Sequence, residues 1–224
     1  MSAAVRSLLL LSVLLAGSAA VAKSSTWNQF RGPAGSGIAE EENPPLEVGP
    51  EKNVAWKVAA PSGMSSPIVV GDMLVLTAFE DGKLYSVAYS RADGHELWRA
   101  QAPAKEIEPF HPTEGSPAAS TPVSDGERIV SYFGSCGLFC YDLMGQEQWR
   151  HEMPTAKTLA DFGTGVSPIL ADGTVVLLRD ESVDPKIFAL DAATGKPKWE
   201  QKRKSKSGFG TPTVWKTSTG TQIV

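Results

Sequence analysis

The sequence predicts an all-β chain, specifically an incomplete β-propeller of four-stranded antiparallel blades, with about three blades and part of a fourth. Three observations support this. Short apolar runs rich in Val, Thr and aromatic residues alternate with turns, in a chain that has 21 Gly and 16 Pro. A tryptophan motif recurs along the chain, and a hydroxyl residue followed by proline recurs in step with it. Four strands repeated at a fixed period are typical of a propeller.

The first 22 residues have the pattern of a secretory signal peptide. Arg6 supplies the positive charge, residues 8–15 form the apolar stretch, and 20–22 read Ala-Val-Ala, which suits cleavage after Ala22. The apolar stretch is shorter than the roughly 20 residues of a membrane span. Ser18 stands where a lipoprotein would carry cysteine. We therefore expect a periplasmic or secreted protein with no lipid anchor and no transmembrane segment after cleavage.

The charge balance disfavours a nucleic-acid partner. Cleavage would remove Arg6 and leave 20 basic and 25 acidic residues, a formal charge of −5. One basic cluster stands apart, and we interpret it as a solvated loop between strands. Its members are Lys196, Lys198, Lys202, Arg203, Lys204 and Lys206.

The clearest repeat is a tryptophan followed by a polar or charged residue. In the last copy, residues 189–199 fit A-x-D-x-x-x-G-x-x-x-W. An earlier copy has Ser90 in place of Asp, and another lacks one residue before its glycine. The four tryptophans stand 42, 51 and 50 residues apart. The residues expected to form this docking motif are Trp56, Ala88, Gly94, Trp98, Asp142, Gly145, Trp149, Ala189, Asp191, Gly195 and Trp199.

The second marker opens the first strand of each unit, because proline is tolerated where no ladder hydrogen bond is lost. Its copies are Ser66-Pro67, Thr121-Pro122, Ser167-Pro168 and Thr211-Pro212. In three units a Gly/Asp pair then provides a tight hairpin, and two further apolar runs precede the tryptophan. Asp and Gly of the motif would shape the turn before the last strand, and the indole would pack one sheet against the next. A sandwich is the alternative, but it gives no reason for one motif at every fourth strand.

These markers divide the mature chain into an N-terminal segment, 23–52, and propeller repeats, 53–224. The blades are expected at 65–100, 119–152 and 166–202, with a partial one at 210–224. Residues 53–58 carry Trp56 without three preceding strands. We expect them to form the outer strand of a blade completed elsewhere, here called the clasp strand. Because the sequence ends within the fourth unit, we also expect it to be a fragment of a longer ring.

The repeat resembles the PQQ-like β-propeller proteins of bacteria. The tryptophan motifs, the Ser/Thr-Pro openings and the segment 27–37, which reads WNQFRGPAGSG, carry the resemblance over nearly all of the mature chain. That family includes quinoprotein alcohol dehydrogenases and the lipoprotein of the outer-membrane barrel-assembly machinery. The resemblance implies architecture more than activity, because one repeat hosts both enzymes and scaffolds.

The enzymes of that family hold a quinone with calcium, use an Asp base and carry a disulfide between adjacent cysteines. This chain has only Cys136 and Cys140, which are not adjacent. Four residues along one strand exceed the reach of a disulfide, although a turn at Cys136 would shorten the distance, so we expect two free, partly buried thiols. No cofactor is predicted; PQQ and calcium belong to the alternative reading only.

Candidate catalytic residues are few. His95 and His151 have no metal-ligand spacing, and His111 draws attention only because it lies in a long Pro-rich loop, 102–117. Asp180, Glu181 and Asp184 could bind calcium, but an acidic, solvated hairpin tip is the more ordinary interpretation. We therefore predict no catalytic residue and no metal site.

The sequence favours an exported, non-catalytic propeller that binds a protein or polymer partner in the cell envelope. The alternative is a PQQ- and calcium-dependent dehydrogenase whose cofactor site lies mostly in C-terminal blades beyond this sequence.

Overall fold

The computed structural model describes residues 27–39 and 44–224. The expected signal peptide, 1–22, lies outside the described residues. Among the residues that are described, no helix is long and apolar enough to cross a bilayer.

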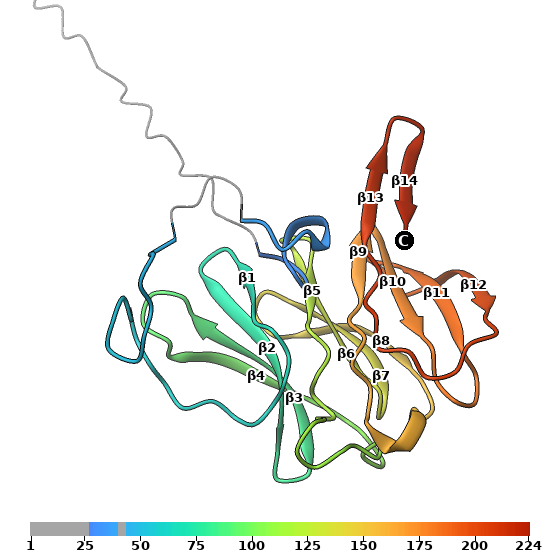
Figure 1. Ribbon diagram of the computed structural model, residues 1–224, viewed down its shortest axis with the longest axis horizontal. Helices are drawn as coiled ribbons and strands as arrows, with labels where there is room; N and C mark the ends of the chain where they lie inside the picture. The colour runs from blue at the N-terminus through green and yellow to red at the C-terminus, as the bar shows by residue number, and fades with distance from the viewer. Residues whose placement is uncertain (1–26, 40–43) are drawn as a thin grey trace, which may run out of the picture.

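The fold is all-β, as the sequence predicts, with three four-stranded antiparallel sheets and a final hairpin (Figure 1). The first sheet contains β1 (Ile68–Val70), β2 (Met73–Glu80), β3 (Lys83–Ser90) and β4 (Glu96–Ala102). The second contains β5 (Val123–Ser124), β6 (Arg128–Phe133), β7 (Gly137–Asp142) and β8 (Glu147–Glu152). The third contains β9 (Ile169–Ala171), β10 (Thr174–Arg179), β11 (Lys186–Asp191) and β12 (Pro197–Lys202). The hairpin pairs β13 (Val214–Thr217) with β14 (Gly220–Ile223), and short 3-10 turns lie at Pro33–Gly35 and Leu159–Asp161.

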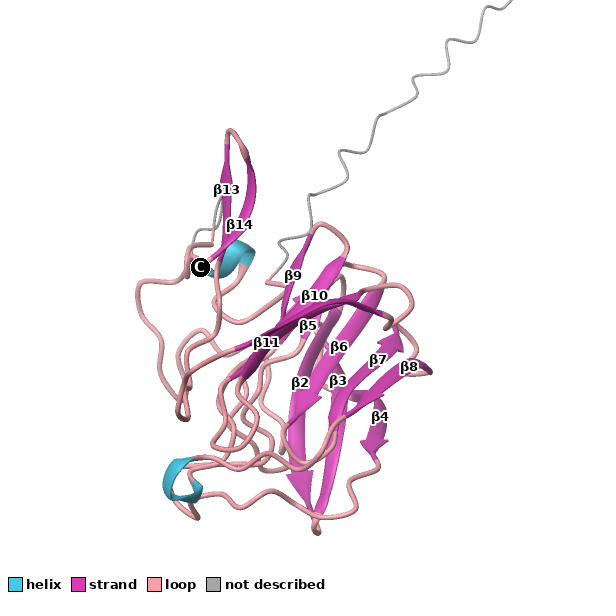
Figure 2. Cartoon of the chain, turned by 90° about the vertical axis from the view of Figure 1, so that its right-hand side faces the viewer, coloured by secondary structure: helices cyan, strands magenta, loops and turns pink. Residues whose placement is uncertain are grey.

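The sheets stand face to face and the cores lie between them (Figure 2). Strand order follows chain order in every sheet, and the first strands β1, β5, β9 and β13 contact one another in succession. This is the arrangement of propeller blades around an axis, with β4, β8 and β12 on the outside. The outer strands expose most of their residues, while β6 and β7 are almost fully buried.

A hydrogen-bonded series of hydroxyl residues joins the blades near the axis. The Ser66 backbone N–H donates to Thr121 Oγ1, and the Thr121 N–H donates to Ser167 Oγ. The Ser167 N–H then donates to Thr211 Oγ1, and each of the three distances is 3.0 Å. The residue before each proline therefore satisfies a backbone donor of the preceding blade, which the sequence markers did not reveal.

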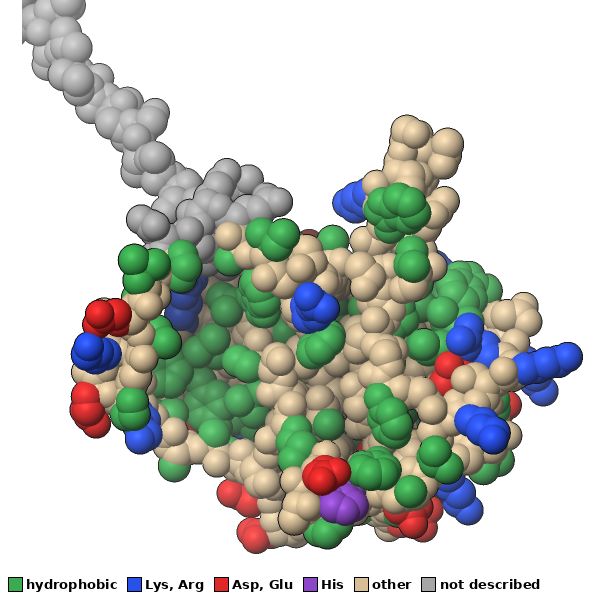
Figure 3. All heavy atoms as spheres, viewed as in Figure 1, with side chains coloured by type: hydrophobic (Ala, Val, Ile, Leu, Met, Phe, Trp, Pro, Cys, Tyr) green, Lys and Arg blue, Asp and Glu red, His purple; other side chains and the backbone are tan. Residues whose placement is uncertain are grey.

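The segment 53–58 has no strand assignment and pairs with no strand in the described part of the chain. The clasp strand was expected to pair with strands outside this sequence, so it stays a prediction. In the first sheet Leu74, Leu76 and Tyr85 are only partly buried. Figure 3 shows a hollowed hydrophobic surface at the left of the view.

The two cysteines are free, as expected, and both are buried, with Cys136 8% exposed and Cys140 0%. Cys136 lies in the β6–β7 turn and packs between the first and second sheets. Cys140 lies in β7 and packs between the second and third sheets. The thiols therefore belong to different packing layers.

Candidate functional site

Three of the four docking tryptophans, Trp56, Trp98 and Trp149, each rest on a glycine of the next repeat. The Trp98 Nε1–H donates to the Leu143 carbonyl over 3.0 Å, and the Trp149 Nε1–H donates to the Ala192 carbonyl over 3.0 Å. Gly145, beneath Trp98, has a φ of +79°, and a Cβ there would lie 2.7 Å from the indole. Glycine is therefore required twice, for its left-handed backbone and for the close approach of the ring.

The other motif residues build this contact. Asp142 Oδ1 accepts the backbone N–H groups of Met144 and Gln146, each over 2.9 Å, which shapes the turn. The small residue of the motif lies directly across the strand pair from the tryptophan, and a register shift follows it in all three sheets. The opposed pairs are Ala88 with Trp98, Cys140 with Trp149, and Ala189 with Trp199. In the last turn Asp191 Oδ1 accepts from the Thr194 N–H, and Gly195 lies under Trp149.

Trp56 and Trp199 mark the two ends of the series. Trp56 lies over Gly94 and its Nε1–H donates to the Arg91 carbonyl over 2.9 Å, although its own segment is not a strand. Trp199 is 44% exposed, and its indole has no hydrogen bond within the described residues. The motif residues thus serve contacts between sheets rather than a pocket.

The first concave site is a cavity of about 310 Å³ near the axis, here called the axial pocket. Four of its lining residues hold the same place in the repeat, two positions before each hydroxyl-proline pair. They are Met64, Ala119, Gly165 and Phe209. The cavity exists because the two middle blades carry small residues at this place while the outer two carry large ones.

The rim of the axial pocket exposes apolar side chains. Met64 is 51% exposed, Phe209 46% and Phe162 39%. Phe162 stacks on His111, whose Nδ1 accepts the backbone N–H of Glu114 over 3.2 Å. The His111 ring therefore supports Phe162 by stacking, and its Nδ1 holds the loop that carries Glu114. These contacts are structural.

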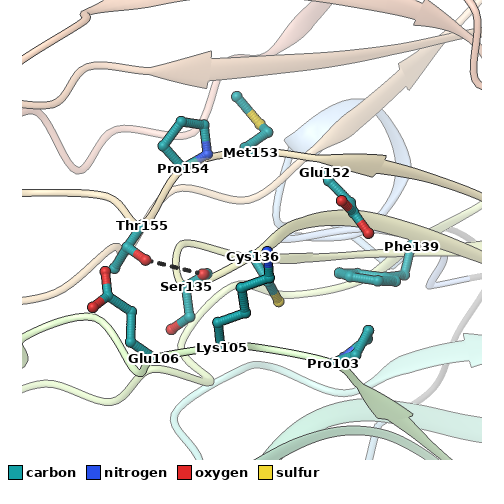
Figure 4. A pocket seen from close by; sticks show the side chains of 10 residues that line it. All are labelled: Pro103, Lys105, Glu106, Ser135, Cys136, Phe139, Glu152, Met153, Pro154 and Thr155. Carbon is teal, nitrogen blue, oxygen red and sulfur yellow. Dashed lines mark hydrogen bonds between the residues drawn. The ribbon is translucent and has the colours of Figure 1, made fainter.

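A larger cavity, of about 480 Å³, opens between the first and second sheets. Lys105, Cys136 and Phe139 line it, and the Thr155 hydroxyl donates to the Ser135 carbonyl over 3.4 Å at its wall (Figure 4). Burial raises the pKa of the Cys136 thiol to about 12. The thiol stays protonated at neutral pH, so this cavity contains no activated cysteine nucleophile.

Glu108 lies between the two cavities and is 1% exposed. Its Oε1 accepts the Thr164 hydroxyl over 2.7 Å at the axial pocket, and its backbone N–H donates to Ser135 Oγ at the larger cavity. Gly134 leaves room for the carboxyl, because a Cβ there would lie 2.3 Å from Oε2. Burial raises the pKa of Glu108 to about 7.

This shift predicts a specific dependence of stability on pH. In the folded state Glu108 keeps its proton up to about pH 7, whereas an ordinary glutamate carboxyl releases it near 4.5. The free energy of unfolding therefore falls by about 3 kcal/mol as the pH rises across that interval. Urea unfolding of the Glu108→Gln variant should lack this component. The exposed Glu114→Gln variant is the control. Identical pH profiles for wild type and Glu108→Gln would contradict the assignment.

Two of the three residues in the acidic hairpin are not solvated as the sequence suggested; the third, Asp184, has a 48% exposed side chain and lies 2.9 Å from Lys186 Nζ. Asp180 and Glu181 are 8% and 5% exposed. Asp180 accepts from Arg203 Nε over 2.8 Å, and Glu181 lies 3.1 Å from Arg179. Their cationic partners neutralise the carboxylates, which leaves them poorly suited to calcium. The lysines of the basic cluster are exposed, as expected, but Lys198 and Lys202 lie in β12 rather than in a loop, and Arg203 has this structural role.

Comparison with known proteins identifies the repeat. A family model of PQQ-type repeats, described as outer membrane protein assembly factor BamB, matches residues 49–162 and 138–219. The chain belongs to this family. No curated protein has significant sequence similarity to it.

Solved structures resemble the chain at low sequence identity. Quinohemoprotein alcohol dehydrogenase ADHIIG from Pseudomonas putida HK5 is 21% identical, with a TM-score of 0.48 over 66% of this chain and 22% of its own. BamB from Moraxella catarrhalis is 20% identical, with a TM-score of 0.46 over 72% of this chain and 44% of its own. The designed protein Ika4 is 13% identical, with a TM-score of 0.50 over 76% of this chain and 96% of its own. The chain thus spans less than half the length of either natural structure.

The axial pocket does not fit the quinone of the family's enzymes. PQQ carries three carboxylates, which need cationic or N–H donors, whereas the one charged residue among those described as lining the pocket is Glu114. Across 27–39 and 44–224, no group of three His, Cys, Asp or Glu side chains is placed to hold a metal ion.

Proposed function

We propose that this protein is a non-catalytic binding module of the cell envelope that receives an apolar side chain of a protein partner in the axial pocket. The observation that carries the proposal is the convergence of three exposed apolar side chains, Met64, Phe162 and Phe209, on one cavity of about 310 Å³. Apolar pockets of this kind anchor interface residues, because burying one large side chain there contributes about 1.5–3 kcal/mol.

The family description supports the envelope setting, since it names an outer-membrane assembly factor. The signal-peptide pattern of residues 1–22 supports export, to the periplasm or beyond. Glu114 borders the pocket with a negative charge. We therefore expect the partner's apolar residue to be flanked by Lys or Arg rather than by Asp or Glu.

The test is site-specific photo-crosslinking in the full-length protein within its own cells. A photoreactive residue in place of Phe209 is expected to give a protein adduct, and the same residue in place of the exposed Lys198 on β12 is not. The substitution Ala119→Trp fills the cavity and should abolish the adduct from position 209. Adducts from both positions, or an adduct that persists with Ala119→Trp, would overturn the proposal.

The competing function is a PQQ- and calcium-dependent dehydrogenase. The same full-length protein can be titrated with PQQ and calcium. Saturable binding accompanied by dye-linked alcohol oxidation would favour the enzyme and reject the binding module.

A further inference from the structure

The two loops that bring Phe162 and Phe209 to the rim of the axial pocket also carry exposed lysines. One loop follows β8 and the other follows β12, and each runs from the outer strand of a blade toward the axis. The lysines stand three to five residues before the aromatic residue of their loop. They are Lys157 on the first loop and Lys204 and Lys206 on the second, here called the loop lysines.

Hydrogen bonds hold the two loops against each other. The Leu159 N–H donates to Ser207 Oγ over 2.6 Å, and Ser207 Oγ lies 3.1 Å from Ser182 Oγ. The Ser182 N–H in turn donates to the Lys157 carbonyl over 2.7 Å. The segments that carry the loop lysines therefore lie side by side, next to the axial pocket.

The loop lysines form no ion pair with the residues that the structure describes. The ion pairs nearby use other cations, namely Arg179 with Glu181, Lys186 with Asp184 and Glu200, and Arg203 with Asp180. On the same two loops Asp161 is the exposed carboxylate. The surface beside the pocket is therefore positive, in a chain whose net charge is −4. Figure 3 shows Lys and Arg side chains gathered at the right of the view, over the third sheet.

The axial pocket is thus bordered by opposite charges. Glu114, on the loop before β5, lines it on one side. The loop lysines lie on the other side, beyond Phe162 and Phe209. The surface between the pocket and these lysines is apolar, since Leu159 is 61% exposed and Phe162 39%. A chain that leaves the pocket in this direction passes an apolar contact and then reaches positive charge.

We propose that the protein partner binds as an extended segment whose apolar residue fills the axial pocket and whose Asp or Glu residues reach the loop lysines. This inference rests on the proposed function, because it describes the same partner. Beside Glu114 the segment carries Lys or Arg, and its acidic residues follow where the chain has left the pocket on the opposite side. Opposite charges at the edge of an interface speed association and fix the orientation of the bound segment.

Photo-crosslinking from position 209, in the full-length protein within its own cells, tests the inference through the yield of the partner adduct. The double variant Lys204→Glu/Lys206→Glu should lower this yield about tenfold, because it places like charges against the acidic residues. The variant Lys204→Arg/Lys206→Arg keeps both charges and should retain most of the yield.

The matched control is Lys196→Glu/Lys216→Glu. It changes the net charge by the same amount at two exposed positions, one between β11 and β12 and the other on β13. Neither position lines the axial pocket. The adduct yield should therefore stay at the wild-type level.

The joined peptide of the partner is a second readout, obtained by mass spectrometry from the protein without charge changes, so it does not depend on how the variants fold. The peptide joined to position 209 should contain Asp or Glu near the crosslinked residue. A photoreactive residue in place of Lys206 should join the same peptide.

The outcomes separate the two proposals. Absence of any protein adduct from position 209 would overturn the proposed function and this inference with it. An adduct whose yield falls equally, or not at all, in the two Lys→Glu double variants would overturn the inference alone. So would a joined peptide without acidic residues, or an adduct from position 206 to a lipid or a polysaccharide.

Discussion

Replacing Trp149 with alanine is expected to lower the free energy of unfolding by about 3 kcal/mol, the lower end of the cost of deleting a large core aromatic, because the ring is partly buried. The ring fills the space over Gly195, and its Nε1–H satisfies the Ala192 carbonyl. Removing it leaves a cavity between the second and third sheets and an unpaired acceptor. Chemical denaturation with urea measures the difference.

Trp199→Ala is the matched control, because this residue has the same place in the motif but is 44% exposed. Its loss should cost no more than about 1 kcal/mol, in the range of exposed positions. Trp149→Phe loses the hydrogen bond and part of the ring, so its loss of stability should fall between the two, at about 2 kcal/mol. Equal losses for Trp149→Ala and Trp199→Ala would show that docking between sheets is not what the motif provides.

Replacing Arg179 with methionine is expected to cost about 3–5 kcal/mol, because it leaves the Glu181 carboxylate buried without its cation. The double variant Arg179→Met/Glu181→Gln should recover part of that loss, since glutamine keeps an acceptor for the Lys157 N–H and carries no charge. Urea unfolding of the two variants gives the comparison.

Arg128→Met is the control for an ordinary surface pair. Arg128 and Asp125 are each 28% exposed in their side chains, and breaking such a pair should cost under about 1 kcal/mol. If Arg179→Met lowers the free energy of unfolding no more than Arg128→Met does, the buried Arg179–Glu181 pair does not stabilise the fold as described.

The sequence predicted the strand content well because hydrophobic runs and turn residues are local signals. The expectation of about three four-stranded blades and part of a fourth is confirmed by three four-stranded sheets and a final hairpin. The turn chemistry was equally local: Asp142 and Gly145 act within five residues of each other. Local physics could therefore be read from residue order alone.

Contacts across blades could not be read in this way. The period of the Ser/Thr-Pro pairs gave the position of Thr121 but not its bond to Ser66, 55 residues away. Likewise, the charges of residues 180–184 suggested a solvated tip, because nothing local indicates that Arg203 reaches Asp180. The clasp strand stays a prediction for a related reason: the docked Trp56 fixes the position of its segment, but the strand partners expected for it are not among the described residues.

The axial pocket is a case in which an available signal was overlooked. Met64 and Phe209 each lie two residues before a hydroxyl-proline pair, and Ala119 and Gly165 hold the same place in the middle units. Comparing residue size at that place would have predicted a cavity between two large side chains. Glu108 carried no such signal, because a single Glu in a Pro-rich loop usually lies in solvent.

Hydrogen exchange of the indole N–H groups, followed by NMR, tests the central claim that the motif tryptophans join successive sheets. The account predicts slow exchange for Trp98 and Trp149, which donate to carbonyls of the next repeat, and fast exchange for the exposed Trp199. Fast exchange at Trp98 and Trp149, or equal protection at all three, would contradict it.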